Sequence, residues 1–135
     1  GGPRRAKVGG VGGVPQGAVL PHAAAMVCHG GHGSPPGALG HGAPLVVLPL
    51  FGVDQRANAA AVARAGVGVS LDVERRARQV LALPSPATLA GLAPAVTRVL
   101  EEASLRQAAT RMAAAMDALP PVDASVAVLE AVAAR

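Results

Sequence analysis

The amino-acid sequence predicts an α/β fold, in which a small parallel sheet is flanked by helices and followed by a helical C-terminal tail. Apolar runs of strand length alternate with helix-like segments in residues 14–72, and the connections between them are short. That alternation specifies right-handed parallel crossovers. The run PLVVLPL at 44–50 is apolar throughout, which is typical of a strand covered on both faces.

Strands are expected at 23–29, 44–50 and 67–71, and PQGAVLPH at 15–22 predicts a short helix or turn. A helix is expected at 34–41, with Ser34 as its N-cap and Pro35 at its first position. Another is expected at 54–65, with Asp54 as its N-cap and Gly66 ending it. Residues 14–72 thus predict an α/β core, preceded by a flexible glycine-rich lead-in at 1–13.

After residue 72 the pattern becomes helical. A charged linker, VERRARQ at 73–79, precedes three weakly amphipathic segments that begin at Ser85, Ser104 and Asp123. We therefore expect a helical C-terminal segment over 73–135, beside a sheet of three or four strands.

Composition argues against several functions. The formal net charge is +4, but beyond the first seven residues the basic side chains are dispersed, and Phe51 is the one aromatic residue. A nucleic-acid groove needs a focused basic patch with stacking aromatics, so no nucleic-acid partner is expected. The single cysteine rules out an internal disulfide. With no run of about 20 apolar residues and no signal peptide, the chain is expected to be cytoplasmic without a membrane span.

The loop CHGGHGS, at 28–34, follows the first predicted strand and leads into a helix. Gly30, Gly31 and Gly33 let backbone N–H groups approach an anion, and the helix dipole points at the same place. Ser34 and His29 add side-chain donors. The loop suits a phosphate or diphosphate, although a tight turn with an N-cap serine is the alternative. It is neither a Walker loop, which needs a lysine, nor a well-spaced dinucleotide fingerprint.

The loop PLFGVDQRAN, at 49–58, follows the second predicted strand. If the two strands are neighbours, about 4.8 Å apart, their loops form one site. Asp54 can accept hydrogen bonds from two vicinal hydroxyls beside the amide of Gln55, which suits a sugar, although Asp54 could simply cap its helix. Asn58 faces the same cleft or is a solvated polar residue.

The histidines and the cysteine predict neither a metal site nor a catalytic nucleophile. His29 and His32 are three residues apart, but no Cys, Asp or Glu cluster completes a metal site, so no metal is expected. Cys28 and His29 are adjacent on a strand and point to opposite faces, so they cannot form a nucleophile–base pair. Cys28 is expected to be a small buried hydrophobic residue.

Residues 14–71, from VPQGAVLPHAAAMVCHGGHGS to GVGVSL, resemble the C-terminal signature of nucleotide-sugar-dependent glycosyltransferases of the glycosyltransferase-B fold. The pattern is similar to bacterial enzymes that glycosylate macrolides and other natural products, and to UDP-glycosyltransferases. The resemblance implies a partial Rossmann-like sheet, half of the donor-binding C-terminal domain. It also implies a UDP- or dTDP-sugar as co-substrate, with no cofactor and no metal.

The resemblance assigns roles position by position. Val14 and Gln16 would contact the base and ribose. His29 would hydrogen-bond the diphosphate, and Asp54 and Gln55 would bind the donor-sugar hydroxyls. The remaining loop residues would wrap the diphosphate oxygens: Gly30, Gly31, His32, Gly33 and Ser34. At Gly13 many family members carry a tryptophan that stacks on the base, and this chain departs from them there.

The resemblance covers only part of a family enzyme. The acceptor-binding N-terminal domain, with its catalytic base, is absent, so no catalytic residue is expected here. The chain is therefore interpreted as the donor-binding fragment of a glycosyltransferase that uses a small-molecule acceptor, inactive alone and requiring the acceptor domain in cis or in trans. The donor subunit of a two-chain enzyme and a non-catalytic structural remnant are the alternatives.

Overall fold

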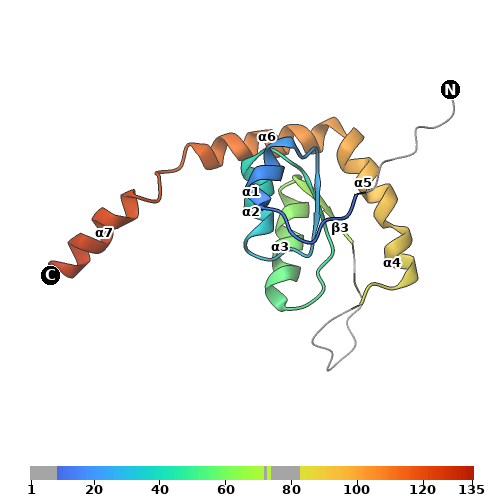
Figure 1. Ribbon diagram of the computed structural model, residues 1–135, viewed down its shortest axis with the longest axis horizontal. Coiled ribbons are helices and arrows are strands. Elements are labelled where there is room, and N and C mark those ends of the chain that lie inside the picture. Colours follow the sequence, from blue (N-terminus) through green and yellow to red (C-terminus); the bar gives the residue numbers. More distant parts are fainter. Residues whose placement is uncertain (1–8, 72, 74–82) are drawn as a thin grey trace.

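The computed structural model describes residues 9–71, 73 and 83–135, and within them a three-stranded parallel sheet lies at the centre (Figure 1). Its strands are β1 (Met26–Cys28), β2 (Leu45–Val47) and β3 (Gly68–Ser70), in the order β1-β2-β3. The predicted α/β fold with a parallel sheet is confirmed. All three strands are shorter than predicted. At β2, the flanking Pro44 and Pro49 have no N–H to donate to the ladder.

The helices between the strands have N-caps one or two residues earlier than residue type predicted. Helix α2 (Ser34–Gly40) has Gly33 as its N-cap, and α3 (Val53–Arg64) has Gly52. The predictions that Ser34 and Asp54 are N-caps are therefore wrong. Gly52 has φ +77°, a left-handed value that suits glycine, and this turn carries the chain into the helix before Asp54 is reached. The segment predicted as a short helix or turn forms α1 (Gln16–Val19) and the 3₁₀ helix η1 (Leu20–His22).

Three predicted C-terminal segments form four helices, because Gly91 separates α4 (Pro86–Ala90) from α5 (Leu92–Glu101). Ser85 caps α4 as expected, accepting from the Thr88 N–H at 3.1 Å. Ser104 does not begin α6 (Ala103–Asp117), because it is already the second helical residue and its hydroxyl donates to the Glu102 carboxylate instead. The charged linker predicted at 73–79 lies outside the described residues, apart from Val73.

Two apolar clusters hold the sheet between helices. On one face, α2, α3 and α6 pack around Leu45, Val47 and Val62. On the other face, α5 and the start of α6 pack around Val46 and Val69. The side chains of β2 are fully buried on both faces, as its continuous apolar run predicts.

The last helix, α7 (Ala124–Ala133), extends away from this body in Figure 1, and all of its residues are exposed. No helix among the described residues is long and apolar enough to cross a membrane.

Candidate functional site

The glycine loop between β1 and α2 is fixed at its second residue. Gly30 is buried with φ +85°. A Cβ at this position would lie 2.8 Å from Val47 Cγ1 and 3.2 Å from the Gln55 carbonyl oxygen. Glycine is therefore required here by the packing of the loop on β2 and α3, and not only by the turn.

The rest of the loop presents free backbone donors. Within the described part of the chain, the N–H groups of 31–34 have no hydrogen-bond partner. Pro35 and Pro36 follow at the second and third positions of α2 and carry no N–H. The first three residues of α2 therefore offer one donor, that of Ser34, and an anion here would be bound mainly by the loop.

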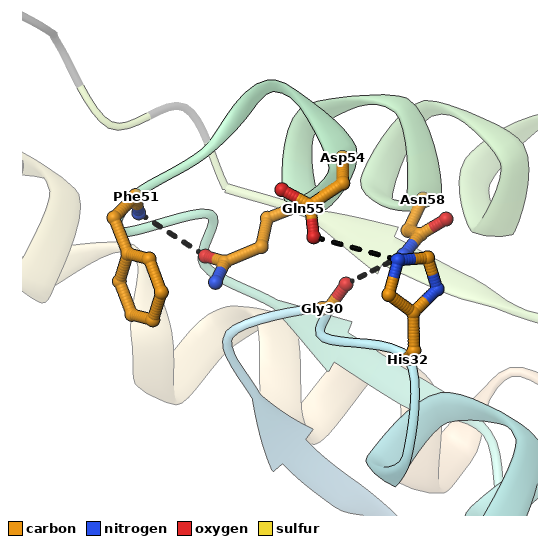
Figure 2. Close-up of polar contacts among 6 residues, drawn as sticks. All are labelled: Gly30, His32, Phe51, Asp54, Gln55 and Asn58. Atoms are coloured by element: carbon orange, nitrogen blue, oxygen red, sulfur yellow. Dashed lines mark hydrogen bonds and ion pairs between the residues drawn. The ribbon is translucent and has the colours of Figure 1, made fainter.

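The loop between β2 and α3 is held by Gln55. This residue is 2% exposed, and its Oε1 accepts from the N–H groups of Leu50 and Phe51, each at 3.1 Å. Figure 2 shows the bond from Phe51. Its amide nitrogen donates to no described residue. Asp54, by contrast, is exposed over 46% of its side chain. Of the two predicted sugar-binding residues, Asp54 presents an accessible carboxylate, whereas Gln55 also builds the loop.

The two loops meet, as expected for loops that follow neighbouring parallel strands. His32 Nε2 lies 3.7 Å from Asp54 Oδ2. One turn further along α3, Asn58 Nδ2 donates to the Gly30 carbonyl at 2.8 Å (Figure 2). Asn58 thus faces the cleft rather than bulk solvent. The glycine loop and the Asp54 carboxylate are consequently parts of one candidate site.

Phe51 is a residue of the site that the sequence analysis did not assign. Its ring stacks on the imidazole of His29, with centroids 5.6 Å apart and planes 15° from parallel. The contact joins the end of β1 to the end of β2. The sequence feature that could have indicated Phe51 is its position: the chain's one aromatic residue directly follows the central predicted strand.

The segment before β1 adds the polar group predicted to contact base or ribose. Gln16 Nε2 donates to Ser34 Oγ at 3.2 Å, which places α1 beside the start of α2. Val14 and Gln16 also line a pocket of about 490 Å³ beside the edge strand β1. Val14 is 52% exposed, so both residues are accessible from this side of the loop.

Cys28 has no reactive setting. Burial raises the pKa of its thiol, and a hydrogen bond from the backbone of Gly30 opposes that only in part. The neutral thiol is thus favoured, and Cys28 packs at the margin of the α2–α3–α6 core. No three His, Cys, Asp or Glu side chains are placed to hold a metal ion within the ranges that the structure describes.

Comparison with known proteins gives one consistent family. Residues 5–132 match the model of the erythromycin biosynthesis protein CIII-like, C-terminal domain. A PGL/p-HBAD biosynthesis glycosyltransferase of Mycobacterium tuberculosis is 37% identical over 102 residues, 76% of this chain and 21% of that protein. The chain therefore spans about a fifth of this relative.

Solved structures agree. Glycosyltransferase VinC, in complex with dTDP, is 31% identical with a TM-score of 0.74, covering 93% of this chain and 29% of VinC. Glycosyltransferase SnogD from Streptomyces nogalater is 30% identical with a TM-score of 0.67, covering 91% of this chain and 29% of SnogD. The family match over nearly the whole chain and these shared folds show that the chain belongs to the erythromycin biosynthesis protein CIII-like C-terminal domains of glycosyltransferases with the glycosyltransferase-B fold.

Proposed function

We propose that this chain binds a UDP- or dTDP-sugar and serves as the donor-binding part of a glycosyltransferase with a natural-product acceptor. The observation that carries the proposal is the pairing of unsatisfied loop N–H groups at 31–34 with the exposed Asp54 carboxylate across one cleft. A sugar diphosphate has the matching arrangement of a dianion joined to vicinal hydroxyls.

The loop offsets the diphosphate charge without a metal or a lysine. Backbone N–H groups supply fixed partial positive charge, and the imidazoles of His29 and His32 add donors on either side of Gly31. A Cβ on Gly31 would lie 2.7 Å from His29 Nε2, so this nitrogen already lies against the loop backbone. In a displacement at the sugar, these donors would stabilise the negative charge on the leaving diphosphate.

Asp54 would accept hydrogen bonds from two hydroxyls of the donor sugar, with His32 Nε2 beside its Oδ2. The amide nitrogen of Gln55 would donate to a sugar oxygen. Gln16 and Val14 would lie against the ribose and base, since Gln16 already reaches Ser34 at the end of the diphosphate loop. The relative VinC, whose structure contains dTDP, supports a nucleotide diphosphate as the ligand class.

Titration of ¹⁵N-labelled protein with UDP, dTDP and the monophosphates UMP and dTMP tests the diphosphate site. The backbone amides of 30–34 should shift with the diphosphates and much less with the monophosphates. Absence of any shift in these amides at millimolar UDP and dTDP would refute the proposal.

The sugar contact has its own test in Asp54→Asn. This variant keeps the side-chain shape but weakens charge-assisted bonds to hydroxyls, worth about 1.5–3 kcal/mol. Affinity for dTDP-glucose or UDP-glucose should fall by roughly tenfold or more at that energy, while affinity for the free diphosphate holds or rises. Asp117→Asn, on the exposed end of α6, is the matched control. Equal losses for sugar nucleotide and free diphosphate would remove Asp54 from the sugar contact.

A further inference from the structure

We propose that Asn58 is a positioning residue that aims the diphosphate-binding N–H groups of the glycine loop, an inference that rests on the proposed function. Asn58 lies on α3, outside the loop, and reaches it through one bond, from Nδ2 to the Gly30 carbonyl at 2.8 Å (Figure 2).

The direction of one carbonyl fixes the direction of the next N–H. The Gly30–Gly31 peptide is trans and planar, so the Gly31 N–H points opposite to the Gly30 C=O. Because Asn58 holds that carbonyl toward α3, the Gly31 N–H is turned away from α3. This N–H has no partner among the described residues. Gly31 itself lies beside His29, since a Cβ on Gly31 would be 2.7 Å from His29 Nε2, and His29 is one of the predicted diphosphate donors.

This control matters because glycine would otherwise permit the opposite peptide orientation. Gly30 and Gly31 are adjacent residues without side chains, and glycine populates both signs of φ. Pro35 and Pro36 have no N–H, so the start of α2 has too few donors to bind the anion in place of the loop. By binding the Gly30 carbonyl, Asn58 selects the orientation of the Gly30–Gly31 peptide in which the Gly31 N–H is available to a ligand.

Two substitutions separate this role from general stability. Asn58→Ala removes the donor without adding charge. UDP affinity should fall about tenfold, because binding must then hold the Gly30 carbonyl in an orientation in which it has no partner. Asn58→Asp keeps the shape and directs a carboxylate at the Gly30 oxygen, so its affinity should fall at least as far at pH 7.5. On protonation, the introduced carboxyl group becomes a donor again, and the affinity ratio of variant to wild type should rise toward one as pH falls from 7 toward the ordinary aspartate pKa of about 3.9.

The pH-dependent ratio is the readout that a merely structural residue does not give. Asp54, His32 and His29 are ionisable side chains near the loop, and the same residues are present in the variant and in the wild type. Gln107→Glu, the same amide-to-carboxylate change on the exposed face of α6, should leave the ratio at one throughout. Urea unfolding of each variant identifies the range in which the protein is folded.

The outcomes distinguish this inference from the proposed function. Wild-type protein that does not bind UDP refutes the proposed function. In that case, the Gly31 amide of unliganded Asn58→Ala still tests the positioning, because a lost orientation must shift its resonance and hydrogen exchange. A folded Asn58→Ala that binds UDP within twofold of wild type, or one whose Gly31 amide is unchanged, overturns the role of Asn58.

Discussion

Replacement of Gly30 by alanine tests whether the glycine loop is anchored by packing. The change places a Cβ at φ +85°, which costs roughly 1–2 kcal/mol for a residue with a side chain. It also creates a 2.8 Å approach to Val47 Cγ1 in a fully buried strand, and overpacking of this kind costs about 1–3 kcal/mol. We expect a loss of about 3 kcal/mol in the free energy of unfolding, or roughly 10 °C in Tm.

Gly33→Ala is the matched control, because it lies in the same loop with φ −88° and no atom within 4 Å of the added Cβ. Gly-to-Ala changes at compatible positions stabilise by about 0.4–1 kcal/mol, so the two variants should move stability in opposite directions. Urea unfolding followed by far-UV circular dichroism measures both. Adding Val47→Ala to Gly30→Ala should recover about 1 kcal/mol relative to additivity. A Gly30→Ala protein as stable as wild type would refute the reasoning.

Variants at three further positions test other contacts. Gln55→Leu should lower the free energy of unfolding by about 2–4 kcal/mol, because two N–H groups lose their acceptor, whereas Gln55→Glu, which keeps an acceptor oxygen, should lose less. Phe51→Leu should alter the His29 ring resonances with a much smaller change in stability. Arg98, by its hydrogen bond, lowers the pKa of Glu102, so that stabilisation is present at neutral pH and is lost as pH falls through the acid range. Arg98→Gln should therefore flatten the dependence of Tm on acidic pH, and an unchanged slope would contradict this.

The parallel sheet was predictable from the sequence, since it follows from apolar run length and short connections. The meeting of the two loops was predicted only on the condition that their strands are neighbours, and β1 and β2 are neighbours. The helix starts were not, because Ser34 and Asp54 have the residue types of N-caps while glycines occupy those positions. The Ser34 hydroxyl instead accepts from Gln16, a contact 18 residues away that no local pattern reports.

The part that Gln55 plays in holding the loop after β2 was also beyond the sequence. A glutamine after an aspartate at a helix start has the same residue pattern whether it faces a ligand or bonds its own loop. Only the structure shows that residues 50 and 51 lie against the start of α3, where the Gln55 Oε1 accepts hydrogen bonds from both of their N–H groups. Phe51 was missed for a related reason, because its partner His29 lies on a different strand end.

Helix α3 explains how a site made of two loops can keep a fixed geometry. Gln55 and Asn58 are three residues apart and share one face of the helix, where the first holds the loop after β2 and the second the loop after β1. Ala59 and Val62 bury α3 against the sheet, so both amides are carried by one packed element. Asp54 is on the same helix. Helix α3 therefore sets the separation between the free N–H groups and the carboxylate together with the packing of Gly30 on β2, and a displacement of this helix would change the spacing that the proposed sugar diphosphate must fit.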